Sequence, residues 1–464
     1  AAGSAEGVNV SSITVGLSAN EYATVTNMYL KDNATGATLG TAKNVPGLSN
    51  IYSMSPNIAL AANGSKLIDL YANVIASSNA GPWIANIDAS GSGIVTGGSV
   101  ASVVAAQPLQ TMTVAANGTL TVTNGSMPDA AIVLAGSTGN YVAEYQFSAV
   151  NEGFTVDKLK LKVTNNFATS TSGVSLSYTD KLGATKTANS VFITGTEANA
   201  TATFTGLTMY VPADSDASLK VYVSLTSTAY GATSGANSTI TLDANEGFNA
   251  TGDSGTVDTD SPATDKASNS FYVRKTKPTF AKQTLTGAPS TGNALFKFTV
   301  VADGAGNIEI KQLGFTVTTN GMDVTDLYLY DSNSGVQLTD TAVTTLTSAE
   351  GPSLRLVVGA AAGTGGTVGD DDIIIVSSSD SPVKTFEVRG TISNYTSSAS
   401  DSMTLKFKQD ATATSTAAAG TILNTANGNY NVWSDRSASA HATTTTDWTN
   451  GYLLKDMTQM QQLP

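Results

Sequence analysis

The sequence predicts an all-β protein of tandem immunoglobulin-like β-sandwich modules with no substantial helix. Short runs alternate apolar and polar residues and are rich in β-branched side chains, as in the stretch from Val8 to Val15. Glycine, asparagine or aspartate bounds these runs, which is the pattern of strands with one buried face. No convincing amphipathic helix interrupts them. With 464 residues the chain is too long for one compact core.

A repeated order of strand patterns indicates three copies of one module. Each copy has a long alternating run, then a Tyr- or Ser-containing strand before a turn, then a late apolar strand. The long runs are Ala5–Val15, Glu152–Val163 and Gly306–Val317; the second strands are Val25–Asp32, Val174–Asp180 and Val324–Asp331; the late strands are Lys66–Val74, Ser218–Val223 and Val383–Arg389. We therefore expect modules at residues 1–108, 109–273 and 274–427, followed by a closing segment at 428–464. The clearest linker is Arg274–Pro278, because a cationic step that ends in proline breaks a strand pattern.

Module one is expected to lack its first strand. Modules two and three open with the apolar strands Val142–Phe147 and Ala294–Phe298, whereas the sequence of module one begins after the equivalent position. A sandwich without this strand exposes unpaired backbone groups and an apolar slot, which favour an incoming strand. We expect the acceptor groove to be lined in part by Val8, Val10, Ile13 and Val15.

The closing segment is the candidate donor of such a strand, or a segment that docks on a module. It contains two of the three tryptophans. The residues expected on the donor or docking side are Trp433, Trp448, Tyr452, Leu453 and Leu454. A plainer reading is that truncation or processing shortened the chain at its start and that the closing segment folds onto its own third module.

Composition argues against several classes of function. A net charge of −13 disfavours a nucleic-acid partner, and no stretch of 18 apolar residues is present for insertion into a membrane. With no cysteine, one histidine and no cofactor motif, we expect no enzymatic activity and no required cofactor. His441 lies among Ser437, Ser439, Asp435 and Asp447, but without a strained nucleophile elbow we expect a surface loop or a subunit contact.

Calcium is the one ion for which the sequence offers candidate ligands. Asp370, Asp371 and Asp372 follow a glycine-rich turn and could supply hard oxygen ligands. They do not match the spaced carboxylate pattern of a calcium loop, so a solvated acidic loop is the alternative.

The Val324–Asp331 stretch and the closing segment carry a family resemblance. The closing segment reads Trp-Ser-Asp at 433–435 and Asp-Trp-Thr-Asn-Gly-Tyr at 447–452. In these residues the chain resembles the large threonine-rich surface proteins of Patescibacteria, the small-celled bacteria of the candidate phyla radiation. The resemblance implies tandem immunoglobulin-like modules and an extracellular protein of S-layer or appendage type without enzymatic activity.

The expected function is therefore structural. We expect a secreted subunit at the cell surface that forms a homo-oligomer or polymer through β-strand addition. The alternative is an adhesin that binds a host-cell glycan or protein through its module loops.

Overall fold

The computed structural model consists of two compact units, unit 1 at Ala1–Asn117 and unit 2 at Gly118–Pro464. The residues described are 1–75, 82–102, 106–113, 118–194, 199–244, 247–285, 290–303, 306–339, 353–358, 374–376, 383–396, 401–423 and 429–462. No helix within these ranges is long and apolar enough to cross a membrane.

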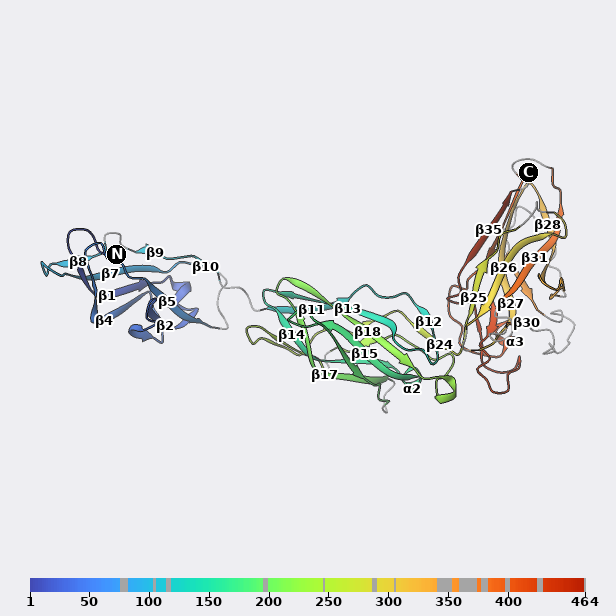
Figure 1. The fold of residues 1–464 in the computed structure, drawn as a ribbon, viewed down its shortest axis with the longest axis horizontal. Coiled ribbons are helices and arrows are strands. Elements are labelled where there is room, and N and C mark those ends of the chain that lie inside the picture. The colour runs from blue at the N-terminus through green and yellow to red at the C-terminus, as the bar shows by residue number, and fades with distance from the viewer. Residues whose placement is uncertain are drawn as a thin grey trace. The chain divides into compact units, whose positions relative to one another are not determined.

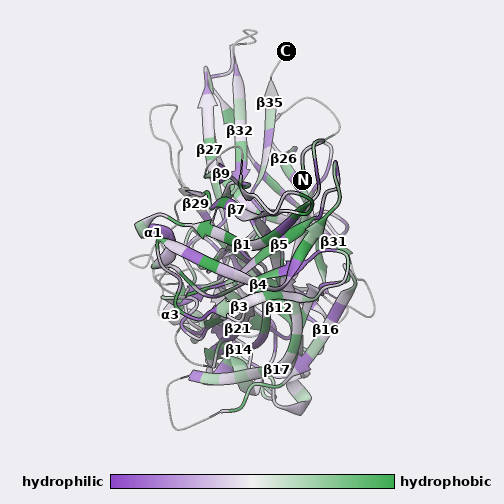
Figure 2. Ribbon diagram, turned by 90° about the vertical axis from the view of Figure 1, so that its left-hand side faces the viewer, coloured by the Kyte–Doolittle hydropathy of each residue, from purple (hydrophilic) through white to green (hydrophobic). Residues whose placement is uncertain are grey.

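The prediction of an all-β fold without substantial helix is confirmed (Figure 1). The described helices are single turns: α1 (Ala19–Tyr22), α2 (Asn165–Thr169), α3 (Ala419–Ile422) and the 3-10 turn η1 (Thr228–Tyr230). Figure 2 shows hydrophobic and hydrophilic residues interleaved along the strands. This alternation gives each sheet one face for the core and one face for solvent.

Unit 1 packs a larger sheet on a smaller one. The larger sheet runs in the order β4 (Ser49–Leu60), β1 (Val8–Gly16), β7 (Asn86–Gly93) and β8 (Ser99–Ala101), with β9 (Gln107–Pro108) also on β7. The smaller sheet runs in the order β3 (Thr38–Lys43), β2 (Val25–Asp32) and β5 (Ile68–Val74). Its core includes Ile13, Met28 and Tyr52, whose hydroxyl donates to the Met28 carbonyl at 3.0 Å. Burial raises the pKa of Tyr52 to about 12.

A two-stranded ribbon of β6 (Pro82–Trp83) and β10 (Met112–Thr113) also belongs to unit 1. The division from unit 2 therefore lies after residue 117 rather than at the expected position 108, because β10 pairs back into unit 1.

Module two occupies the first part of unit 2. One sheet runs in the order β11 (Thr119–Asn124), β13 (Asn140–Val150), β18 (Ser215–Leu225), β15 (Thr171–Thr179) and β16 (Thr185–Ser190). The facing sheet runs in the order β22 (Val257–Asp258), β21 (Asn249–Gly252), β14 (Phe154–Thr164), β20 (Thr241–Leu242) and β23 (Lys266–Ala267), with β17 (Asn199–Val211) on β14. A third sheet joins β12 (Ala131–Leu134), β24 (Phe271–Arg274) and β19 (Asn237–Ser238).

Module three completes unit 2 and incorporates the closing segment. One sheet runs in the order β25 (Pro278–Lys282), β26 (Ala294–Ala302), β31 (Val383–Ser393) and β28 (Asp323–Asp331). The other runs in the order β34 (Trp448–Asn450), β33 (Val432–Ser434), β27 (Ile308–Asn320), β32 (Ser402–Phe407) and β35 (Met457–Gln462), with β29 (Ser353–Val357) and β30 (Ile374–Val376) on β27. The chain beyond residue 427 thus supplies three strands to the sheet of module three.

The repeats inferred from the sequence share details of backbone geometry. The pairing of β2 with β5 shifts register beside Asn27 (φ 48°), and the pairing of β28 with β31 shifts beside Asp326 (φ 51°). The long strands β1, β14 and β27 each carry a bulge at the same place, one residue after Val10, Val156 and Ile310. These matches allow residues to be compared between modules one at a time.

The stability of module three is expected to depend on pH through Glu387 in β31. Burial alone would raise its pKa, but hydrogen bonds from Lys297, Ser332 and Arg389 outweigh burial and lower the pKa to about 2. A carboxyl with a lowered pKa stabilises the fold above its ordinary pKa, and that contribution is lost as pH falls toward 2. We expect Glu387→Gln to flatten the stability of module three between about pH 4.5 and pH 2.

The measurement is urea denaturation at several pH values, followed by the fluorescence of Trp433 and Trp448. Equal pH slopes for the wild type and Glu387→Gln would contradict this account.

Candidate functional site

The candidate site is the free edge of β5 in unit 1. In module two the equivalent strand β18 lies between β13 and β15, and in module three β31 lies between β26 and β28. Among the described residues, β5 pairs with β2 alone. No described strand of unit 1 corresponds to β13 and β26, so within the described residues one edge of β5 is unpaired.

The register identifies which residues of β5 face the missing strand. Leu70 lies opposite Leu30 in unit 1, just as Val221 lies opposite Leu176 and Val388 lies opposite Leu329. Two residues earlier, Ile68 corresponds to Leu219 and Phe386 by the same register. Ile68 and Leu70 are therefore the core-facing residues of an edge that is closed in the other two modules.

Burial shows the consequence of the missing strand. Leu219 and Val221 are 0% exposed, and Phe386 and Val388 are 1% and 0% exposed. In β5, by contrast, Ile68 and Leu70 are only partly buried, and Val74 at its end is 50% exposed. The apolar side chains of β5 are therefore less covered than those of β18 and β31.

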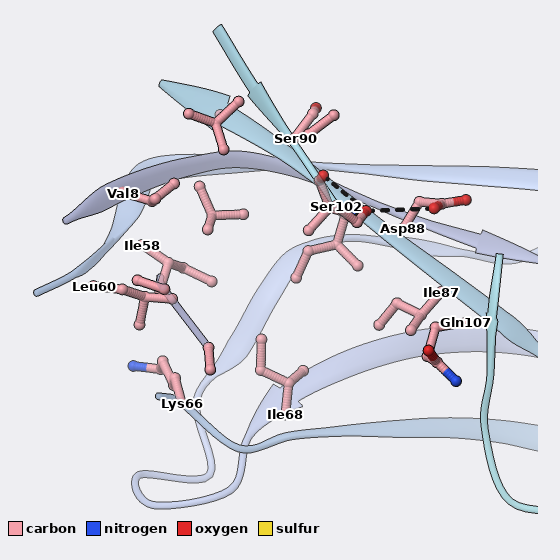
Figure 3. Close-up of a pocket in the computed structure, with 18 of the residues that line it drawn as sticks. Val8, Ile58, Leu60, Lys66, Ile68, Ile87, Asp88, Ser90, Ser102 and Gln107 are labelled. Atoms are coloured by element: carbon pink, nitrogen blue, oxygen red, sulfur yellow. Dashed lines mark hydrogen bonds between the residues drawn. The ribbon is translucent and has the colours of Figure 1, made fainter. Parts of the chain in front are cut away.

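Two cavities lie along β5 in place of the missing side chains. The first has a volume of about 660 Å³, and Figure 3 shows Val8, Ile58, Leu60, Ile68 and Ile87 around it. The second has a volume of about 590 Å³ and is lined by Leu70, Val74, Trp83 and Met112 among others. Ile68 lines both, so the two cavities form a slot along the β5 edge.

Three of the four predicted acceptor residues line this slot. Val8, Val10 and Ile13 face the first cavity. Val15 is 0% exposed and packs in the core of unit 1 instead. The sequence-based prediction did not include Ile68, Leu70 and Ile87. These residues lie on β5 and β7, far along the chain from the start of module one, where a strand was expected to be absent. The repeated strand pattern Lys66–Val74 could have located Ile68 and Leu70, because the equivalent strands β18 and β31 pair with β13 and β26.

Charged groups at the end of the slot are paired. Lys66 lines the first cavity and bonds to Asp32 at 2.7 Å, which lowers the pKa of that carboxyl. Asp69, between Ile68 and Leu70, accepts a hydrogen bond from the Asn33 amide at 2.8 Å. The slot therefore combines an apolar interior with charge on the outward face of β5.

The start of the chain occupies one end of the slot. The Ala2 amide donates to the Gly64 carbonyl at 2.8 Å, and the Asn63 amide donates to the Gly3 carbonyl at 2.9 Å. In module two the same position is held by Ala149 of β13, which lies opposite Ser215. Ala1 to Gly3 thus lie where the end of β13 lies in module two.

The predicted donor or docking residues contact their own chain. Trp433 and Trp448 are 1% and 0% exposed, and their indole nitrogens donate to the carbonyls of Asn450 at 2.8 Å and Ala442 at 2.9 Å. Leu454 is 4% exposed in the core of module three, whereas Tyr452 and Leu453 are partly buried. Donation of this segment would require these contacts to open.

The closing segment also joins module two to module three. Asp435 is 0% exposed and accepts hydrogen bonds from the Ser234 hydroxyl at 2.6 Å and the Lys275 amide at 2.7 Å. Arg274, 4% exposed, donates to Thr449 at 2.8 Å and lies over the ring of Trp433. Burial lowers the pKa of Arg274, while Asp435 opposes that shift.

His441 forms no link to a nucleophilic serine. Its Nδ1 bonds to Asp447 at 2.8 Å and its Nε2 bonds to Glu309 at 2.5 Å. Its side chain is 5% exposed, so it lies inside the protein rather than in a surface loop. Both ring nitrogens contact carboxylates, so neither is placed to accept a proton from a serine hydroxyl.

The calcium hypothesis falls outside the described residues, because Asp370, Asp371 and Asp372 lie in a part of the chain that the structure does not describe. Within the described ranges, no three acidic or histidine side chains cluster as metal ligands.

No family model matches the chain, and no curated protein matches it. Among solved structures, it is similar to the BSP domain of a biofilm-associated protein, with 8% identity, 86% of this chain and 88% of that chain covered, and a TM-score of 0.17. It is also similar to the RrgB pilus protein of Streptococcus pneumoniae (10% identity, 82% and 55% covered, TM-score 0.17) and the major pilin subunit of Bacillus cereus (11%, 88% and 92%, TM-score 0.15). Likeness at these TM-scores is too low to carry a functional conclusion.

The joint between modules two and three gives a testable expectation. Asp435→Ala removes the acceptor for Ser234 and Lys275 and one of the two buried carboxylates, the other being Asp447, that offset the charge of Arg274. We expect a loss of about 3 kcal/mol in the free energy of unfolding of unit 2, measured by urea denaturation. The control Asp253→Ala breaks an exposed pair with Lys181 and a hydrogen bond from Tyr210, and it should lower the free energy of unfolding much less. Equal effects of the two changes would refute a stabilising role for the joint.

Proposed function

We propose that the protein is a structural subunit of a self-assembling cell-surface layer or extracellular filament. In this proposal unit 1 of one copy accepts a β-strand from a second copy at the free edge of β5. Each copy then offers one acceptor, so the contact is head-to-tail and propagates. The resemblance of the closing segment to surface proteins of Patescibacteria supports the extracellular location.

The observation that carries the proposal is the contrast between equivalent strands. β18 and β31 have a partner on each edge, whereas β5 has one partner and a slot of two cavities beside it. An unpaired edge with an apolar slot is a template for strand addition, because main-chain hydrogen bonds supply affinity and the slot supplies specificity.

Apolar burial is the main favourable contribution available to such a contact. In modules two and three the equivalent strand buries four apolar side chains. They are Val142, Ala143, Tyr145 and Phe147 in β13, and Leu295, Phe296, Phe298 and Val300 in β26. Burial of one large apolar side chain contributes about 1.5–3 kcal/mol. Three or four such side chains contribute about 5–12 kcal/mol before the cost of association, which ranges from about 4 to 15 kcal/mol. A favourable balance therefore requires a pre-formed slot, which unit 1 has.

The donor is not assigned to the closing segment in this proposal. That segment supplies β33, β34 and β35 to module three and locks the joint through Asp435. Its removal would expose the core of module three, so loss of assembly in a chain without it would not identify a donor.

An adhesive role finds less support at the one exposed aromatic pair of unit 1. Tyr29 and Tyr71 stack at 5.4 Å on the outward face of β2 and β5, as a sugar platform would. The Lys31 ammonium, however, lies 5.6 Å and 5.3 Å from the two ring centroids. The aromatic surface that a sugar ring would use is thus in contact with the protein's own cation.

The test places a charge in the slot. Ile68→Glu and Leu70→Glu put a carboxylate where apolar side chains of the incoming strand would pack, so we expect at least a tenfold loss of assembly. Negative-stain electron microscopy and light scattering measure it. Asn73→Glu is the matched control, because its side chain lies on the outward face of the same strand.

Circular dichroism and Trp83 fluorescence check that unit 1 of each variant is folded. Assembly of a folded Ile68→Glu chain at the wild-type level would reject the β5 edge as the contact. A wild type that stays monomeric at all concentrations would reject the structural function.

A further inference from the structure

We infer that module three has a binding site for a carboxylate anion beside its joint with module two. The site is a polar cavity of about 440 Å³, and its lining includes Lys275, Arg436 and His441. Among the described residues no aspartate or glutamate lines it, although the chain has a net charge of −13. The cavity belongs to unit 2 alone, so the site is independent of the strand acceptor proposed in unit 1.

The other two modules have a carboxylate of their own at the equivalent position. The shared bulge aligns β1, β14 and β27 residue by residue. In this alignment Glu6 of module one and Glu152 of module two correspond to Gly306 of module three. Gly306 lines the cavity, so module three has open space where the other modules have a glutamate side chain.

Both glutamates bind the backbone of a turn that faces them. The Glu6 carboxylate accepts hydrogen bonds from the amides of Val95 and Thr96 at 2.9 Å and 3.0 Å. The Glu152 carboxylate accepts a hydrogen bond from the Ser254 amide at 2.7 Å. The repeat therefore shows, within the same chain, that a carboxylate fits this position.

The equivalent turn of module three has its amides already bound. The Ser437 amide donates to Asp435 at 3.3 Å, and the Ala438 amide donates to Asp447 at 3.1 Å. An anion in the cavity is therefore held by side chains rather than by the backbone. The side chains that line the cavity and can donate to an anion are those of Lys275, Arg436, Ser437 and Ser439.

Lys275 supplies a positive charge that no carboxylate offsets. Its ammonium group donates to the Arg436 carbonyl at 2.9 Å, and in the described part of the chain it forms no ion pair. Arg436, by contrast, is paired with Glu309. Lys275 is partly buried, so water screens its charge less than that of a fully exposed lysine. An anion is the ligand that this charge favours.

A bound carboxylate would fasten the joint between the modules. Lys275 lies in the linker that leaves module two, and Ser437 lies in the closing segment that completes module three. A ligand that contacts both side chains binds the folded joint and not the unfolded chain, so it stabilises unit 2.

The first test measures the binding of glutarate, which has the carboxylate of a glutamate side chain, to the full chain. Isothermal titration calorimetry at constant ionic strength is the method. We expect a dissociation constant on the order of 1 mM, as suits a ligand of few atoms. Lys275→Gln should weaken binding about tenfold or more, because it removes a charged donor. Lys277→Gln, in the same linker but outside the cavity lining, is the matched control and should bind as the wild type does.

The second test returns the glutamate to module three. Gly306 has no positive φ, and the nearest atom to an added Cβ is the Lys275 Cε at 3.3 Å, which a flexible side chain can move. We expect Gly306→Glu to abolish glutarate binding and to raise the midpoint of thermal unfolding of unit 2. Gly306→Gln has the same size without the charge and should raise the midpoint less. Glutarate binding that persists in Gly306→Glu would overturn the site.

Two further ligands identify the anion. Inorganic phosphate that binds as tightly as glutarate would overturn the choice of a carboxylate. A capped Ala-Glu-Ala peptide separates the two sources of a carboxylate: tighter binding of the peptide supports a protein side chain as the ligand, and tighter binding of glutarate supports a free acid. If neither glutarate nor the peptide binds to a chain that circular dichroism shows to be folded, the inference is wrong.

Discussion

A β-strand in the interior of a sheet has a partner on both edges and a covered inner face, and the comparison between the modules of this protein depends on that arrangement. Unit 2 satisfies it twice, at β18 and at β31. Unit 1 repeats the register, the bulges and the turns of the other modules but leaves one edge of β5 without a partner in the described chain. At this position, the described part of unit 1 thus has one strand fewer than each module of unit 2.

The closing segment shows how the same requirement is met elsewhere in the chain. Module three uses residues beyond 429 to extend its second sheet, with β33 on one side of β27 and β35 on the far side of β32. Both tryptophans of this segment are buried, and Trp433 also contacts Arg274 at the joint with module two. The second sheet of module three is therefore completed by residues far along the same chain.

The sequence allowed the class of fold to be predicted, because the alternation of apolar and polar residues is local and can be read directly from the strands. The unpaired edge of β5 could not be located from the sequence, because strand pairing depends on the topology of the sheet and not on the local pattern around Ile68. Val15 was expected in the groove because it shares a strand face with Ile13, but it lies in a part of the core that closes without the missing strand. The burial of His441 between Asp447 and Glu309 was also out of reach, because Glu309 is far away in the sequence.

The contact between Ser234 and Asp435 spans 201 positions of the chain. Contacts of such long range form late, since the entropy of closing the intervening loop is lost before any gain is made. Module two can therefore acquire its own core while the joint stays open, whereas module three also needs the closing segment, which supplies β33, β34 and β35. The segment from Asn429 onward thus both completes module three and attaches it to module two, so a chain in which this segment is unfolded has a flexible connection between the two modules.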